Sequence, residues 1–386
     1  MRWKSSRLSE ISYIGDGAHA SLKRESRGIP YLTAKNITKS GIDHSNVEYI
    51  SQETYNKHFK QNSNALTQPK QGDILYSIIG SIGGVYVVQD EKIGISSSVA
   101  IFRAKTEVID YQYLAYFLKS PCFGSQVKAI KGGVAQGFMS LGKMGSVQVL
   151  YPDDIEYQKR IVGILSTYDD LIENNKKQIK LLEETAERLY REWFVELHFP
   201  GCEDVKIVDG VPKGWLDGTV GDIALFKRGK TITKAQIHKG NVPVVAGGLE
   251  PAYYHNVANT VAPVITISGS GANAGFARLY NVDVFASDCS FVDSQTTPYL
   301  YWTYCFIKDS KAKLDSLQKG AAQPHVYAKD INALKIYIPT DDILDRFCKV
   351  VTPYFDKIKN LQRQNDLLLQ ARDRLLPRLM SGEVEV

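Results

Sequence analysis

The sequence lacks several features that define whole classes of protein. Its 5 cysteines are scattered over 386 residues and never stand in a CxxC spacing, which excludes a disulfide scaffold and a standard zinc site. Its longest apolar runs, such as Val261–Ile267, are far shorter than the roughly 20 residues that span a bilayer. No apolar stretch follows the basic start of the chain, so no signal peptide is expected. We therefore expect a soluble cytoplasmic protein that does not engage membranes.

Motifs for catalysis and cofactor binding are missing as well. The glycine-rich run 269–275 follows an expected strand but leads into another, Phe276–Tyr280, so no helix N-terminus is available for a pyrophosphate. Gly229-Lys-Thr has Ala224 where a P-loop requires its first glycine. The acidic run 152–159 fits helix capping better than metal binding, because its carboxylates crowd a helix start. We expect no catalytic residue, metal or cofactor in this chain.

Positive charge is concentrated in two separate blocks of the chain. Residues 1–150 carry a net charge of +7 and residues 212–339 carry +4. The intervening residues 151–211 carry −6, and residues 340–386 are neutral. Basic surface attracts polyanions, most commonly nucleic acid, although a small lysine excess can also be ordinary solvated surface.

The two halves of the chain repeat each other. Gly28-Ile-Pro-Tyr-Leu is echoed by Gly240-Asn-Val-Pro-Val-Val, and Lys131-Gly-Gly-Val-Ala-Gln is echoed by Lys319-Gly-Ala-Ala-Gln. Further echoes follow in the same order along the chain, with a period near 186 residues. A period this long indicates duplication of a whole domain together with the helix that follows it.

Each half begins with a strand-rich domain that contains one short aromatic helix. Short runs of Val, Ile and Tyr are broken by Gly, Asn and Pro, a pattern typical of strands and turns. The helices are expected at Tyr111–Ser120 and Tyr299–Lys308. The strands are expected at Ile74–Ile79, Val85–Val88, Ala100–Arg103 and Val147–Tyr151, and then at Val264–Ile267, Phe276–Tyr280, Ser290–Asp293 and Leu334–Ile338.

A long amphipathic helix is expected after each strand-rich domain. Apolar residues recur in steps of three and four, as in the seam of a coiled coil. Asn175 and Asn365 each fall on a seam, where a polar residue can select one pairing register. The seam residues on which we rely are Ile161, Tyr168, Ile172, Leu182 and Leu189 in the first helix, and Tyr354, Ile358, Leu368 and Leu375 in the second.

The two long helices are expected to pair with each other rather than to lie singly on their own domains. The first helix must leave one domain and the second must return to it, so the pair should be antiparallel with a rough two-fold relation. About 39 residues at 1.5 Å each give a spacer of roughly 55–60 Å. This predicts an α+β protein with two similar α/β domains and a helical spacer.

Two segments resemble conserved parts of the specificity subunits of type I restriction–modification systems. One is Arg188-Leu-Tyr-Arg-Glu-Trp-Phe-Val-Glu-Leu-His-Phe-Pro-Gly, with Val211-Pro-Lys-Gly-Trp after it. The other is Arg372-Asp-Arg-Leu-Leu-Pro-Arg-Leu-Met-Ser-Gly-Glu near the end of the chain. The strand–Pro–helix transitions at Val149-Leu-Tyr-Pro and Ile336-Tyr-Ile-Pro and the twofold layout are similar too, so the resemblance extends over the whole chain.

The resemblance implies a non-catalytic DNA-binding subunit that reads a bipartite double-stranded site. It places target recognition domains at 1–152 and 201–340, the second with an entry linker, and spacer helices at 153–200 and 341–386. It also implies assembly with two modification subunits, which would bind S-adenosylmethionine and methylate adenine, and with motor–nuclease restriction subunits. From the residues alone, a duplicated protein-binding scaffold that does not recognise DNA remains an alternative.

The residues expected to contact DNA lie in turns and loops of the two strand-rich domains. Lysine can contact phosphate or guanine, and glutamine can pair with adenine. Glycine-rich turns let backbone approach the duplex closely. The candidates are Lys35, Asn36, Ser81, Lys131, Gln136 and Lys143 in the first domain, and Lys230, Ser270, Asn273, Lys319, Gln323 and His325 in the second.

Overall fold

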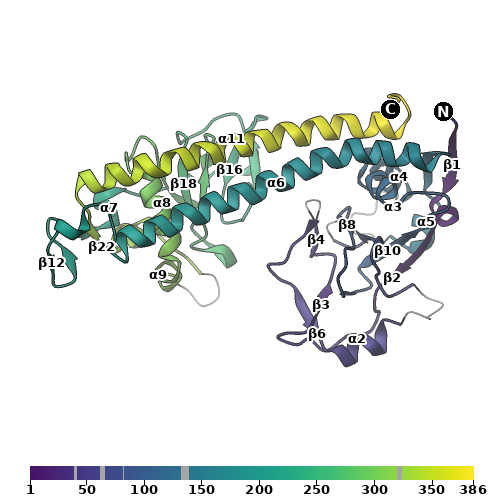
Figure 1. The fold of residues 1–386 in the computed structure, drawn as a ribbon, viewed down its shortest axis with the longest axis horizontal. Helices are drawn as coiled ribbons and strands as arrows, with labels where there is room; N and C mark the ends of the chain where they lie inside the picture. Colours follow the sequence, from purple (N-terminus) through teal and green to yellow (C-terminus); the bar gives the residue numbers. More distant parts are fainter. Residues whose placement is uncertain (39–40, 61–65, 81, 132–138, 320–323) are drawn as a thin grey trace. The chain divides into compact units, whose positions relative to one another are not determined.

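A computed structural model describes residues 1–386 except for 39–40, 61–65, 81, 132–138 and 320–323. The chain forms two compact units: unit 1 comprises Met1–Glu173 with Asp366–Val386, and unit 2 comprises Asn174–Asn365 (Figure 1). Two helices of 40 residues, α6 (Ile155–Phe194) and α11 (Asp341–Met380), each contribute to both units. The part of unit 1 that precedes α6, residues 1–154, is called head 1. The rest of unit 2, residues 195–340, is called head 2.

Head 1 contains strands β1–β11 and the short helices α1–α5. The strands are β1 Trp3–Arg7, β2 Ser12–Asp16, β3 Ile29–Leu32, β4 Ile37–Thr38, β5 Gly41–Ile42, β6 Glu48–Ile50, β7 Ile74–Ser77, β8 Val85–Val87, β9 Gly94–Ile95, β10 Val99–Ala104 and β11 Gln148–Pro152. The helices are α1 Leu8–Ile11, α2 Gln52–His58, α3 Tyr111–Lys119, α4 Pro121–Lys131 and α5 Leu141–Gly145.

Head 2 contains strands β12–β22 and the short helices α7–α10. The strands are β12 Ile207–Val208, β13 Val211–Pro212, β14 Leu216–Thr219, β15 Lys227–Arg228, β16 Val242–Val245, β17 Tyr253–His255, β18 Val264–Ser268, β19 Ala277–Tyr280, β20 Phe285–Ala286, β21 Cys289–Asp293 and β22 Lys335–Ile338. The helices are α7 Val220–Ile223, α8 Leu300–Asp309, α9 Lys311–Ser316 and α10 Ala328–Asn332.

The two heads have the same sheet topology. A four-stranded antiparallel sheet has the order β2-β10-β7-β8 in head 1 and β15-β21-β18-β19 in head 2. A three-stranded mixed sheet has the order β6-β3-β9 in head 1 and β17-β16-β20 in head 2, with the last pair parallel in both. The first and last strands of each repeat, β1 with β11 and β14 with β22, pair antiparallel and close the head. This confirms that the chain is a duplication of one α+β unit.

The predicted elements coincide with observed ones. Each of the eight predicted strands and both predicted aromatic helices match an element of the structure to within two residues at either end. The central strands β7 and β18 are buried along their whole length, which explains why their sequences are continuous apolar runs rather than alternating ones.

Each head packs on both long helices of its own unit. In unit 1, one apolar cluster joins Phe117 of α3, Leu165 of α6 and Leu379 of α11. In unit 2, Trp302 of α8 packs among aromatic rings that include Tyr190 of α6. Trp193 and Phe347 join the two helices there, with ring centroids 5.7 Å apart. The strands of each head are therefore anchored to a helical base.

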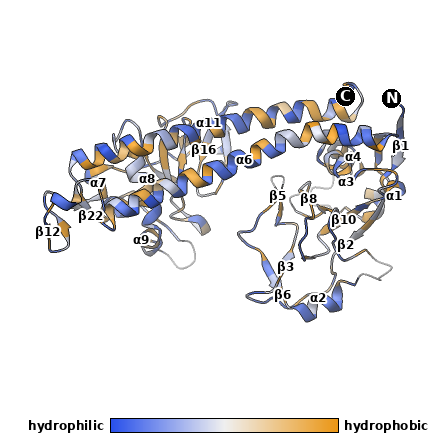
Figure 2. Cartoon of the chain, in the orientation of Figure 1, coloured by the Kyte–Doolittle hydropathy of each residue, from blue (hydrophilic) through white to orange (hydrophobic). Residues whose placement is uncertain are grey.

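Within each unit the two helices run antiparallel. In unit 1, Asp169 of α6 forms an ion pair with Arg372 of α11, and the hydroxyl of Tyr157, earlier in α6, accepts from the Val386 N–H (2.9 Å) beyond the end of α11. In unit 2, Asn175 lies against Asn365, whereas Trp193, later in α6, lies against Phe347, earlier in α11. In Figure 2, apolar and polar residues alternate along both helices, as expected for amphipathic helices.

The predicted seam residues are all buried or partly buried. Ile161, Ile172 and Ile358 are buried, and the others are partly buried: Tyr168, Leu182, Leu189, Tyr354, Leu368 and Leu375. Val351 and Phe355 are buried too, because α11 packs on head 2 as well as on α6. Burial therefore extends beyond the narrow stripe of an isolated coiled coil.

Both seam asparagines are buried, and they contact each other. The Asn175 amide nitrogen donates to the side-chain oxygens of Asn365 (2.9 Å) and Gln364 (3.1 Å).

Among the residues that the structure describes, no helix is both long enough and apolar enough to cross a membrane.

Candidate nucleic-acid interface

The predicted loops of head 2 meet at one end of its four-stranded sheet. Strand β18 ends there, and the following loop is tied to the chain before β21 because the Gly269 N–H donates to the Asp288 carbonyl (3.1 Å). The same loop is tied to the chain before α10, since the Gly271 N–H donates to the Pro324 carbonyl (3.0 Å). We call the described residues 229–230, 269–273, 287–288, 319 and 324–327 the head 2 tip.

The predicted residues of head 2 that the structure describes all lie at this tip. Ser270 donates its hydroxyl to the Asp288 carboxylate, and the Asn273 amide donates to the Gly247 carbonyl (3.4 Å). Lys230 is exposed. Gln323 lies outside the described residues.

Lys319 and His325 pair with each other on either side of residues 320–323, which lie outside the described residues. Each donates its backbone N–H to the other's carbonyl, both at 2.9 Å. The Lys319 ammonium is 2.8 Å from the Asp330 carboxylate, so its charge is paired within the head. The His325 ring stacks on Tyr327 with centroids 5.9 Å apart. Imidazole and phenol groups on one small surface can both hydrogen-bond to phosphates or base edges.

Head 1 has a related turn at the end of β7, with one residue fewer between its hydrogen-bonded ends. The Ser77 N–H donates to the Gly84 carbonyl (3.0 Å), as the Ser268 N–H donates to the Phe276 carbonyl (2.9 Å) in head 2. Both turns use glycine in the left-handed region, at Gly80 and Gly83 in head 1 and at Gly271 and Gly275 in head 2. An L side chain would strain these positions, so the turn geometry depends on glycine.

The predicted DNA-contacting residues of head 1 come from several different elements, and not all of them are described. Lys35, in the turn between β3 and β4, and Lys143, in α5, are exposed. Lys131 is the last residue of α4, and only its backbone is described. Ser81 and Gln136 lie outside the described residues.

The prediction that Asn36 contacts DNA needs correction. Its side chain is only 4% exposed, and its amide oxygen accepts from the Thr33 N–H (2.9 Å). Its amide nitrogen donates to the Asp43 and Asn46 carbonyls at 3.4 and 3.3 Å. These contacts occupy both ends of the amide inside the loop, so Asn36 shapes the loop and is not available to a base edge.

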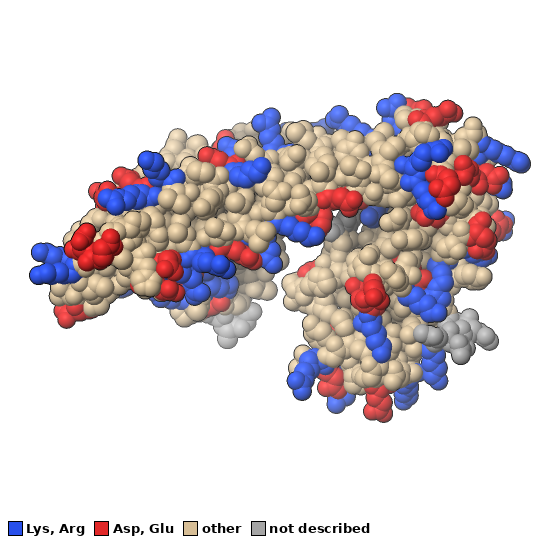
Figure 3. All heavy atoms as spheres, in the orientation of Figure 1, with Lys and Arg blue, Asp and Glu red and all other residues tan. Residues whose placement is uncertain are grey.

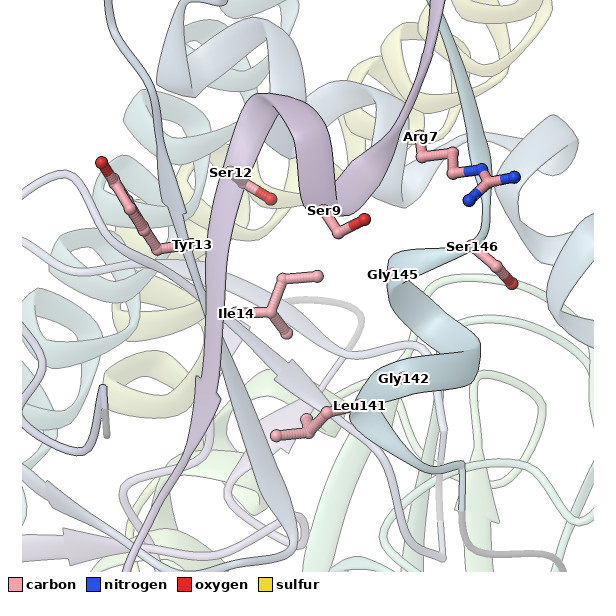
Figure 4. Close-up of a pocket in the computed structure, with 9 residues that line it drawn as sticks. All are labelled: Arg7, Ser9, Ser12, Tyr13, Ile14, Leu141, Gly142, Gly145 and Ser146. Atoms are coloured by element: carbon pink, nitrogen blue, oxygen red, sulfur yellow. The ribbon is translucent and has the colours of Figure 1, made fainter. Parts of the chain in front are cut away.

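A shallow surface pocket of about 500 Å³ lies beside α5 of head 1 (Figure 4). Its lining is mainly small and hydroxyl-bearing side chains together with one guanidinium, and consists of Arg7, Ser9, Ser12, Tyr13, Ile14, Leu141, Gly142, Gly145 and Ser146. In Figure 4, the Arg7 guanidinium lies on the same side of the pocket as Ser146, whereas Tyr13 points away from them. Exposed Lys143 lies on the same helix, so this side of head 1 offers positive charge and hydroxyl groups to a polyanion.

Head 2 contains a basic segment in which only Lys230 was predicted to contact DNA. Residues 223–249 hold Lys227, Arg228, Lys230, Lys234 and Lys239 and no acidic residue. The Lys234 ammonium lies 5.5 Å from the ring centre of Tyr253 on β17. On the face drawn in Figure 3, by contrast, basic and acidic side chains are interspersed. The acid-free run was visible in the sequence and could have been found by scanning charge in shorter windows.

Two structural equivalences were missed by sequence reasoning. Gly17 and Gly229 follow β2 and β15, and a Cβ at either would lie 2.0–2.2 Å from a backbone oxygen of an adjacent segment of the same head. Asp288 and Ser98 directly precede the equivalent strands β21 and β10. Aligning the strand starts of the two repeats would have revealed both pairs.

Outside the head 2 tip, the described residues include two thiols whose pKa is raised by burial and one cluster of possible metal ligands. Burial raises the pKa of the Cys289 thiol to about 12 and that of Cys348 to about 11, which disfavours the reactive thiolate. Among the described residues, Glu192, Glu196 and His198 could together hold a cation, but all three are exposed. Exposed acidic groups of this kind are common without an ion.

Comparison with known proteins agrees with the presence of two similar heads. The family model for the type I restriction modification DNA specificity domain matches residues 1–184 and again 212–369. The specificity subunit of the type I restriction enzyme MjaIX of Methanocaldococcus jannaschii is 28% identical, over 100% of this chain and 94% of its own. The specificity subunit of the type I restriction enzyme HindI of Haemophilus influenzae is 22% identical, over 82% of this chain and 87% of its own.

A solved structure shares the fold. The S subunit of a type I restriction–modification system from M. genitalium superimposes with a TM-score of 0.54 at 17% identity, covering 98% of this chain and 96% of that one. With two matches of the family model, the first over all of head 1 and the second over head 2 from residue 212 onward, the chain belongs to the family of type I restriction–modification specificity subunits and carries its DNA specificity domain twice.

Proposed function

We propose that head 1 and head 2 each read one half of a bipartite double-stranded DNA site. The observation that carries this proposal is that the two heads share one topology while side chains differ at the equivalent end of the four-stranded sheet, the tip of each head: Ser98 in head 1 and Asp288 in head 2. A common frame would present both tips to DNA in the same way, and different side chains would select different bases. Exposed lysines such as Lys35, Lys143 and Lys230 would contact phosphates and hold the register.

The paired helices α6 and α11 would act as the spacer between the half-sites. Antiparallel pairing within each unit and the buried contact between Asn175 and Asn365 support a stiff, register-specific connection. The gap between half-sites would then depend on helix length, at 1.5 Å for each residue.

The chain would direct the chemistry of other subunits in the cytoplasm without performing a chemical step of its own. Two modification subunits would bind S-adenosylmethionine and methylate adenine, and motor–nuclease subunits would cut unmodified DNA. The absence of catalytic motifs in the sequence and the names of the MjaIX and HindI relatives, both specificity subunits, support this division of labour.

The test is a gel-shift series with the modification subunits present, using a duplex selected from a randomised library and a scrambled control duplex. Specific binding should weaken as salt increases, with a slope of about −0.9 for each phosphate contact. Lys230→Ala should reduce this slope by about one without changing the preferred sequence. If no duplex is preferred at any salt concentration, the chain is a protein-binding scaffold instead.

A further inference from the structure

Asp288 of head 2 and Ser98 of head 1 occupy the same place in the repeated fold. The Gly269 N–H donates to the Asp288 carbonyl (3.1 Å), and the Ile78 N–H donates to the Ser98 carbonyl (3.0 Å). In each case the donor follows the central strand, and the acceptor directly precedes the neighbouring strand, β21 or β10. The two backbones are therefore equivalent here, and the two side chains can be compared directly.

The two side chains are used differently. The Ser98 hydroxyl accepts from the Ala34 N–H (2.9 Å) and pairs with the Ser96 hydroxyl (2.6 Å), so it is turned into its own head. Asp288 is exposed, and one of its carboxylate oxygens accepts from the Ser270 hydroxyl. Within the part of the chain that the structure describes, no donor reaches the other oxygen. Head 2 therefore presents a free acceptor where head 1 presents none.

A carboxylate is an unusual group on a surface that approaches DNA, because phosphates repel it. It gains most when it accepts a hydrogen bond from the amino group of a base, and Asp or Glu accepting from cytosine N4 is a recognised pairing in the major groove. Asp288 lies beside residues that we expect to contact DNA, Ser270 and Lys230, and Ser270 fixes its orientation.

We propose that Asp288 is a specificity-determining residue that accepts a hydrogen bond from the amino group of cytosine in the half-site read by head 2. This inference rests on the proposed function. It also explains how a duplicated fold can read two different half-sites, since the equivalent Ser98 offers no charged acceptor.

The test uses Asp288→Asn in the full complex with modification subunits. Asparagine can still accept from Ser270, but its amino group then favours a base with a major-groove acceptor, which is guanine, adenine or thymine, over cytosine. Binding sites would be selected from a duplex library randomised in both half-sites, and the melting temperature of each variant would be measured. We expect the cytosine preference at one position of one half-site to fall by roughly 5- to 100-fold, with the other half-site unchanged.

Two further variants separate base reading from folding. Asp288→Ser copies the residue that the same backbone carries in head 1, so it should fold and lose discrimination at that one position. Asp283→Asn makes the same change of charge at the other end of β18, where the Asp283 carboxylate accepts from the Ala262 N–H (2.8 Å). It should leave every base preference unchanged.

The outcomes distinguish this inference from the proposed function. If the wild-type complex selects a bipartite site and both Asp288 variants keep the same base at every position, Asp288 only supports the loop and the inference is wrong. If the wild-type complex selects no sequence at all, the proposed function itself fails.

Discussion

At the scale of the residue, a buried amide pair in the helix seam, Asn175 with Asn365, joins α6 to α11. The Asn175 nitrogen has acceptors in both Asn365 and Gln364, so its two hydrogens are satisfied. A buried amide that loses its partner costs about 1–3 kcal/mol, whereas replacing both partners by apolar groups can be nearly neutral. The pair therefore opposes any pairing that separates the two residues.

A double-mutant cycle tests this contact. Asn365→Leu alone should lower the free energy of unfolding by about 1–3 kcal/mol, because it leaves Asn175 facing an apolar side chain. The double variant Asn175→Leu/Asn365→Leu should be less destabilised than the sum of the single variants. Urea denaturation followed by circular dichroism measures both values. Strict additivity would show that the two amides do not interact.

Glu183 of α6 gives a pH-dependent prediction. Burial raises the pKa of its carboxyl above the usual 4.5, partly offset by the nearby positive charge of Lys308. The folded state therefore holds this proton more tightly than the unfolded state, so stability is lost as pH rises from 4.5 through the folded pKa. Glu183→Gln should raise the melting temperature of the chain at pH 8, and the gain should shrink towards pH 4.5. A gain that grew on acidification would contradict the direction of the shift.

At the scale of the element, repetition explains most of what was predicted correctly. Strands and aromatic helices were located because apolar runs and turn residues are local signals, and each appears twice. The closure of each head by its first and last strands was not predicted. Trp3 pairs with Pro152 and Leu216 with Ile338, across more than a hundred residues in each case. No local pattern encodes such a pairing.

Two neighbouring leucines of α6 test the helix seam. Leu182 packs against the unit 2 core, whereas Leu181 is 61% exposed. Leu182→Asp should destabilise the chain by about 2 kcal/mol or more and abolish assembly, because it places an unpaired carboxylate in the seam. Leu181→Asp makes the same chemical change one residue away and should fall within about 0.5 kcal/mol of wild type. Equal effects of the two variants in thermal denaturation and in subunit pull-down would refute the assigned seam.

At the scale of the whole molecule, the spacer makes a geometric prediction. Four residues inserted after Gln178 add about one helical turn, or 6 Å. Base pairs rise by about 3.4 Å, so the recognised gap should lengthen by one or two base pairs. Both half-site sequences should stay the same, because neither tip is altered. Mapping methylated adenines in cells that carry the variant measures both properties. Altered half-sites with an unchanged gap would rule out the spacer role.

The sequence alone determined the duplication, the two basic blocks, the strand and helix positions and the seam of the long helices. These depend on periodicity and composition, which are readable over short stretches of chain. Tertiary structure decided which loops meet at a tip and that the Asn36 amide is hydrogen-bonded inside its own loop. It also decided that Asp288 is exposed beside Ser270, whereas the equivalent Ser98 of head 1 is hydrogen-bonded within its head. Loops have no repeating pattern, and their side chains are positioned by contacts between segments distant in sequence, so only the folded chain defines them.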